Sequence, residues 1–147
     1  METFDHLSDL EINVGATTRV ELPEVAPKAV LIVKPATEAN APYFNAMLRR
    51  TGARARRMAR TDRITAEDAE MNRADDRELF PRYVLVNWEG IVTKAGEPVP
   101  FNADNAREFC AKLPAWLFDR VRNQAATPER FLEAGDDLPD TKALSGN

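Results

Sequence analysis

The chain has 147 residues, of which 44% are hydrophobic and 30% are charged, as expected for a single globular domain. Its net charge of -4 argues against a general nucleic-acid-binding protein, and the lack of any run of about 18 apolar residues argues against a membrane span. The acidic N-terminus does not have the pattern of a secretory signal, and the single cysteine, Cys110, excludes an intrachain disulfide, so a cytosolic protein is expected.

Residues 1–15 are predicted to form a flexible N-terminal arm, because a few apolar side chains are scattered among acidic ones. The next segment, "TTRVEL" at 17–22, alternates and is rich in β-branched residues, which predicts a strand. The continuous apolar run "AVLIVK" at 29–34 predicts a buried strand that pairs with the first one. A β element is therefore expected over residues 17–34.

A short helix of about ten residues is expected next. Asn40 or Ala41 lies near its N-cap, Pro42 suits its first turn and Gly52 its end. An arginine-rich linker is predicted over residues 49–63. Its seven arginines are Arg49, Arg50, Arg54, Arg56, Arg57, Arg60 and Arg63.

Two interpretations of the arginine run stay open. It can be a solvated linker that pairs with the acidic segment after it, or a docking patch for an acidic protein surface. A nucleic-acid patch is disfavoured, because no aromatic residue is interleaved and the chain is acidic as a whole.

The acidic segment predicts a helix over about 66–80. Thr65, with Asp68 three residues later, resembles a capping box in which aspartate replaces glutamate. Pro81 is expected to interrupt this helix or to begin a new one. The segment "RYVLVNWEGIV" fits both a strand and a helical stripe, and we favour a helix through about Trp88.

A short hairpin is predicted over residues 91–101, with Gly96 in its turn. Asn102 then suits an N-cap, Pro114 begins another helix, and Thr127 with the following proline begins a last one. These elements predict a helical core over residues 65–134. It belongs to a single globular domain over 16–134, with a disordered tail over 135–147. The fold class is mainly α with a small β element.

Residue chemistry points to no catalytic, cofactor-binding or metal site. His6 is the only histidine and lies in the arm, so a catalytic histidine pair or a Cys/His zinc site is not expected. Cys110 lies on the apolar face of its helix and is expected to be a buried core residue. The acids between Glu67 and Glu78 are best explained as the solvated face of a helix. The protein is therefore expected not to be an enzyme.

Two segments carry a resemblance to a known family. These are "VNWEGIVTKAGEPVPFNADNAREFCAKLPAWLFDRVRNQAATPERF" at 86–131 and "KPATEANAPYFNAMLRR" at 34–50. The Trp-Glu-Gly element, the G-x-P-V-P-F turn, the Asn-capped helix and the Leu-Pro-x-Trp helix are similar to tail assembly chaperones of tailed bacteriophages and prophages. The arginine-rich stretch at 49–63 is not part of that pattern.

The resemblance implies a helical, self-associating protein that binds the tape-measure protein and tail-tube subunits and is absent from the finished virion. It implies neither a cofactor nor a nucleic-acid or membrane partner. The expected location is the host bacterial cytoplasm during phage assembly. A second interpretation, a structural virion protein of the tail or the head–tail junction, stays open, because flexible arms and an arginine run also suit subunit packing.

The resemblance and the composition together suggest where a partner binds. Two pairs of aromatic residues are expected to form an apolar platform for a partner helix, with arginines of the run at its charged rim. The candidate partner-binding residues are Trp88, Phe101, Trp116, Phe118, Arg54, Arg56, Arg57 and Arg60.

Overall fold

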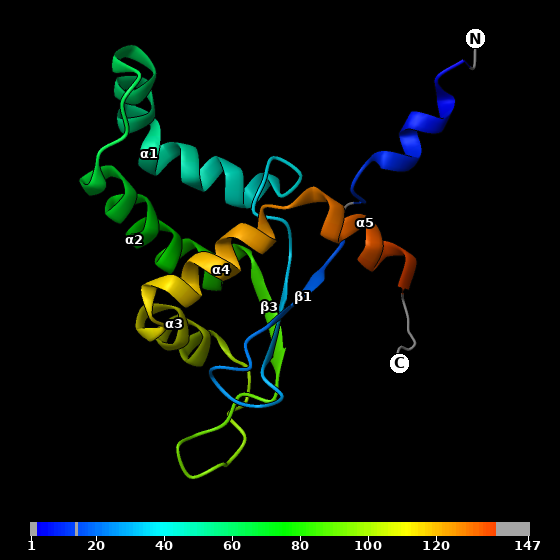
Figure 1. Ribbon diagram of the computed structural model, residues 1–147, viewed down its shortest axis with the longest axis vertical. Helices are drawn as coiled ribbons and strands as arrows, with labels where there is room; N and C mark the ends of the chain where they lie inside the picture. The colour runs from blue at the N-terminus through cyan, green and yellow to red at the C-terminus, as the bar shows by residue number, and fades with distance from the viewer. Residues whose placement is uncertain (1–2, 14, 138–147) are drawn as a thin grey trace.

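The computed structural model describes residues 3–13 and 15–137 and shows a small sheet covered by helices (Figure 1). The strands are β1 (Thr18–Glu21), β2 (Val30–Val33) and β3 (Leu85–Glu89). The helices are η1 (Asp5–Leu10), α1 (Ala41–Thr61), α2 (Ala66–Tyr83), α3 (Ala103–Lys112), α4 (Ala115–Ala125) and α5 (Pro128–Asp137). The predicted fold class, mainly α with a small β element, is confirmed.

The two predicted N-terminal strands form as expected and pair with each other. β1 and β2 are antiparallel, with Thr18 opposite Val33 and Glu21 opposite Val30. Alternate residues of β1 are buried, which matches the period of two in the sequence. β2 is the central strand of the sheet order β1-β2-β3, so both of its edges are paired.

The third strand was not predicted, and the expected helix through Trp88 is wrong. α2 ends at Tyr83, and residues 85–89 pair antiparallel with β2, with Leu31 opposite Trp88. The local sequence fits both structures, so the free edge of β2 decides between them. A strand there satisfies the backbone groups of β2, while a helix leaves that edge open.

Most of the arginine-rich stretch, residues 49–61, is not a linker but forms the second half of a 21-residue helix, α1, and Arg63 follows that helix. The Asn40 side chain caps its start by accepting from the backbone N–H of Tyr43, as predicted. Gly52 does not end the helix, which continues to a left-handed C-cap at Asp62. A mid-helix glycine costs about 1 kcal/mol, a penalty small enough for contacts with α2 to outweigh.

The remaining helices begin where the sequence predicted. Thr65 and Asp68 form the capping box of α2, and the Asn102 side chain caps α3. Pro81 lies inside the last turn of α2 and does not interrupt it. The turn before α3 has Gly96 at φ +89°, but only one bridge, Val92 to Pro98, joins its arms.

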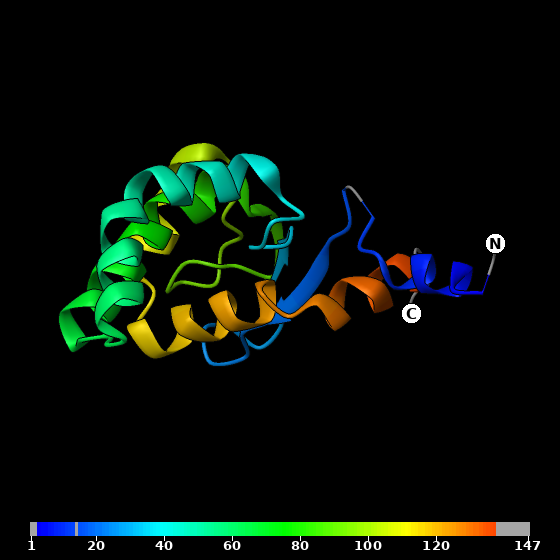
Figure 2. The same ribbon diagram turned by 90° about the horizontal axis from the view of Figure 1, so that it is seen from above.

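The helices lie mainly on one side of the sheet, and η1 and α5 lie at the opposite end of the molecule from the α1–α2 hairpin (Figures 1 and 2). The largest fully buried side chains of the core are Phe80, Phe118 and Phe131, each no more than 1% exposed. The expected N-terminal arm contains the short 3₁₀ helix η1, which has no buried residue. Of the expected disordered tail, residues 135–137 belong to α5, and 138–147 lie outside the described residues.

Candidate functional site: the helical hairpin and the Trp88 groove

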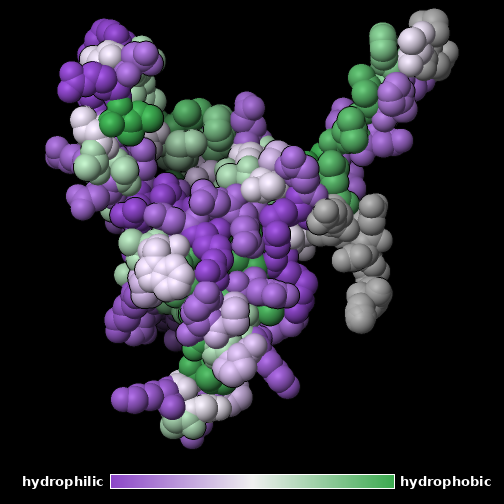
Figure 3. Space-filling view, in the orientation of Figure 1, coloured by the Kyte–Doolittle hydropathy of each residue, from purple (hydrophilic) through white to green (hydrophobic). Residues whose placement is uncertain are grey.

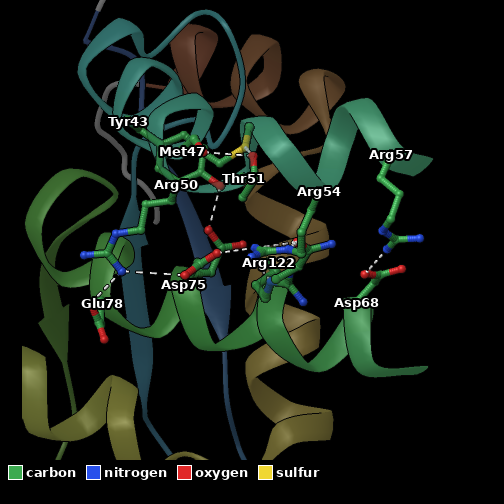
Figure 4. Close-up of polar contacts among 12 residues, drawn as sticks. Tyr43, Met47, Arg50, Thr51, Arg54, Arg57, Asp68, Asp75, Glu78 and Arg122 are labelled. Carbon is green, nitrogen blue, oxygen red and sulfur yellow. Dashed lines mark hydrogen bonds and ion pairs between the residues drawn. The ribbon is translucent and has the colours of Figure 1, made fainter. Parts of the chain in front are cut away.

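The arginine run is divided between two sides of α1. Arg50, Arg54 and Arg57 lie four and three residues apart, so they share one helical face, and that face points at α2 (Figure 4). Arg50 contacts Glu78 at 2.6 Å, while Arg54 pairs with Asp75. The Arg54–Asp75 pair is shielded, with side chains 16% and 19% exposed. The run therefore pairs with the acidic helix after it, as the first interpretation predicted, but it does so as part of a helix and not as a solvated linker.

Other arginines of the run face solvent. Arg49, Arg56 and Arg60 are exposed and lie seven and four residues apart, which places them along one side of α1. Of the four arginines named as partner contacts, Arg56 and Arg60 are thus accessible. Arg54 and Arg57 are held by carboxylates of α2.

Asp68 is the best-buried partner of this hairpin and was not expected to be buried. Its side chain is 5% exposed and accepts from Arg57 and from the backbone N–H of Thr65. The Arg57 hydrogen bond, followed by that of Thr65, holds the pKa of the Asp68 carboxyl down to about 2. The acidic segment is therefore not a purely solvated face, because its inner carboxylates are structural.

This depressed pKa predicts an acid-dependent loss of stability. The contribution of Asp68 is fully present above its unfolded pKa of about 3.9 and is lost as the pH falls toward its folded value. We expect Asp68→Asn to be less stable than wild type at pH 7 and to show a shallower decline between about pH 4 and pH 2. Urea unfolding across that range measures both slopes, and parallel curves would contradict the assignment.

A second buried carboxylate joins three helices. The Tyr43 hydroxyl of α1 donates to Asp76 of α2 at 2.8 Å, and Arg122 of α4 donates to the other oxygen of Asp76 at 2.8 Å. Arg122 also contacts Asp119 at 3.0 Å, which in turn accepts from Arg73. Burial raises the pKa of Asp76, against the lowering effect of Arg122 and Tyr43. No local sequence pattern predicts this network, because its members come from three separate helices.

The predicted aromatic platform is not one continuous surface. Trp88 is 7% exposed and packs edge-on against Phe101, with ring centroids 5.1 Å apart, while its indole N–H donates to the carbonyl of Val99. Phe118 is 1% exposed and contacts Phe80. Trp88 and Phe118 are therefore buried core residues, and Phe101 packs against the core. Trp116 is 60% exposed, and Arg120 lies over its ring.

An open groove does lie beside Trp88, and we call it the Trp88 groove. It has a volume of about 480 Å³ and lies between β3, the turn after it and α3. Its lining is mainly apolar: Val25, Trp88, Ile91, Val92, Thr93, Val99, Asn105, Glu108, Phe109, Lys112, Leu113 and Pro114. Phe101, Trp116 and Phe118 are not among these residues. Trp88 is therefore the one aromatic of the predicted platform that borders a candidate binding surface.

Cys110 and His6, the two residues considered for catalysis, lie in different parts of the structure: Cys110 on α3 and His6 in the N-terminal arm. Cys110 is buried, as predicted, and burial raises the pKa of its thiol to about 12. His6 is exposed in the arm. Within the described part of the chain, no group of three or more histidine, cysteine, aspartate or glutamate side chains is arranged to hold a metal ion. None of the described helices is long and apolar enough to cross a membrane.

Comparison with known proteins identifies the family. A family model described as YdaY prophage protein matches residues 39–137, which include α1 to α5 and β3. No match was found among curated proteins or among solved structures. The match covers most of the chain, including nearly all of the Trp88 groove and the whole ion-paired hairpin. The chain therefore belongs to the YdaY prophage protein family.

Proposed function

We propose that this prophage protein is an assembly chaperone for phage tails, which binds the tape-measure protein and tail-tube subunits in the host cytoplasm and catalyses no reaction. Membership of a prophage protein family supports the phage setting. The resemblance of residues 86–131 to tail assembly chaperones supports the specific role.

The observation that carries the proposal is the Trp88 groove. A chaperone for a long helical protein must cover apolar side chains before that protein assembles, which requires a concave apolar surface with a polar rim. The groove has an apolar lining, and Glu108 and Lys112 stand beside it as an ion pair at 2.8 Å. Its volume suits a few anchoring side chains of a partner helix, and such anchors supply most of the energy of an interface.

The proposal predicts that a charge at the edge of the groove blocks binding. Val92 lines the groove and is 37% exposed, so Val92→Asp is expected to fold while placing a carboxylate against the apolar anchor. Losing an anchor contact costs about 2 kcal/mol or more, equal to at least about a 30-fold weaker affinity. Titration of the purified chain with the tape-measure protein of the same prophage measures this loss.

The matched control is Val86→Asp. Val86 is 36% exposed on β3 and does not line the groove, so the same substitution there is expected to leave affinity unchanged. Circular dichroism verifies that both variants fold. Equal affinity of wild type and Val92→Asp would reject the groove as the binding surface, and no binding by wild type would reject the proposed partner.

A further inference from the structure

The N-terminal arm presents an apolar ridge that its own chain does not cover. Phe4, Leu7 and Leu10 recur every three residues, and a 3₁₀ helix has three residues per turn, so these side chains line one side of η1. Their exposed fractions are 70%, 48% and 63%. Figure 3 shows apolar residues gathered along the projecting arm. A regular apolar ridge left in solvent indicates a docking segment.

The rest of the arm is acidic. Asp5, Asp9 and Glu11 lie between or beside the apolar positions, and residues 3–13 contain no lysine or arginine. A surface that binds this segment must therefore combine apolar contact with positive charge.

A groove of that kind lies between α2 and α3, and we call it the basic groove. It has a volume of about 800 Å³. It is lined by Arg50, Ala74, Arg77, Glu78, Pro81, Arg82, Ala103, Arg107 and Ala111. The α2 residues recur at helical spacing, as do the α3 residues, so each helix contributes one face. The small residues leave room for inserted side chains, and the arginine stems add apolar surface.

The charge of the basic groove is positive. Its single acid, Glu78, is already held by Arg50 at 2.6 Å. Arg77 donates to the carbonyls of Cys110 and Leu113 at the end of α3, and Arg82 lies over the ring of Tyr83. Among the described residues, neither Arg77 nor Arg82 lies within ion-pair distance of a carboxylate. Arg107 pairs with Asp104, but both side chains are exposed, so an acid of the arm can compete with Asp104 for this arginine.

In both views the arm lies at the far side of the molecule from α2 and α3, whose residues line the basic groove (Figures 1 and 2). The arm points away from the helices that line the groove, so the arm that enters it belongs to another chain. We propose that the arm of one copy binds in the basic groove of a second copy. The apolar ridge packs against the small residues of α2 and α3, and the acids of the arm pair with Arg77, Arg82 and Arg107.

This contact joins two different surfaces, so it is heterologous: it links copies into a closed ring or an open chain unless two copies exchange arms reciprocally. It uses neither Val92 nor any other residue of the Trp88 groove, and it stands whether or not the protein binds a tape-measure protein.

The experiment separates the two halves of the contact. One variant disables the arm, Leu7→Asp with Leu10→Asp, and another disables the groove, Arg82→Glu with Arg107→Glu. All four residues are exposed, so both variants are expected to fold. Light scattering during size exclusion is expected to show wild type above the 16.5 kDa chain mass at about 100 µM, and each variant alone as a monomer.

Mixing the two variants is the decisive step. The arm-disabled chain keeps its groove and the groove-disabled chain keeps its arm, so an equimolar mixture is expected to form a complex of two chains. The matched control Arg56→Glu with Arg60→Glu changes the same charge on α1, outside the groove, and is expected to associate as wild type does.

Three results would overturn the proposal: a monomeric wild type, variants that associate like wild type, or a mixture that stays monomeric. Salt provides a readout without substitutions, because raising NaCl from about 0.05 to 0.5 M shortens the screening length and should weaken association several-fold. Salt-independent association of wild type would also contradict the arm–groove contact.

Discussion

Replacing Gly90 with alanine is expected to reduce the free energy of unfolding by about 2–5 kcal/mol, the sum of backbone strain and a steric clash. Gly90 follows β3 with φ at +70°, a region that L-residues rarely adopt. An added Cβ would lie 2.1 Å from the carbonyl oxygen of Lys28 and 2.5 Å from its carbon. These are backbone atoms, so no side-chain rotation relieves the contact. Urea denaturation measures the loss.

Gly96→Ala provides the matched control. Gly96 also has positive φ, +89°, but nothing lies within 4 Å of the position that an added Cβ would occupy. The free energy of unfolding of Gly96→Ala should fall only by the contribution of backbone strain, about 1–2 kcal/mol. Similar losses for the two variants would show that the β1–β2 loop does not pack against the end of β3 as closely as described.

Replacing Asp76 with alanine is expected to cost about 3 kcal/mol, the lower end of the range for breaking a buried ion pair. The change leaves the Tyr43 hydroxyl and the Arg122 guanidinium without their shared acceptor in the interior. The lower end applies because Arg122 keeps Asp119 as a second partner. Thermal and urea unfolding at pH 7 measure the effect.

Glu108→Ala tests whether burial is the reason for the large expected cost of Asp76→Ala. Glu108 pairs with Lys112 at 2.8 Å, but their side chains are 61% and 76% exposed. An exposed helical pair contributes about 0.3–0.5 kcal/mol, so this variant should be nearly as stable as wild type. If Glu108→Ala cost as much as Asp76→Ala, burial would not be the cause of the loss at Asp76.

The helix starts could be predicted from sequence because a cap is a local structure. Asn40, Thr65 and Asn102 each accept from a backbone N–H three residues later, so a short window holds the whole interaction. The strands β1 and β2 were predictable for a similar reason, since their apolar patterns and the loop between them are adjacent in sequence.

The errors concern elements that depend on distant partners. Residues 85–89 fit both a helix and a strand, and β2, more than fifty residues earlier, selects the strand. The second half of α1 has few apolar residues, and carboxylates of α2 stabilise it. The spacing of Arg50, Arg54 and Arg57 was the available signal, because it places three cations on one helical face opposite an acidic helix.

The candidate site was only partly visible in the sequence. Trp88 was a predicted partner contact and does border a groove. Phe118 is buried in the core, and Trp116 is exposed on α4 but does not line the groove. The groove is built from β3, a turn and α3, which become neighbours only when the chain folds. Nearly all of its lining lies within residues 86–131, the stretch that resembles tail assembly chaperones.

Quantitative mass spectrometry of purified phage particles tests the central proposal most directly. An assembly chaperone acts before the tail is complete, so the chain should be abundant in the lysate of an induced host and absent from finished particles. If the particles contain it at a fixed copy number, comparable to that of other tail proteins, the chain is a structural virion protein and the chaperone proposal is wrong.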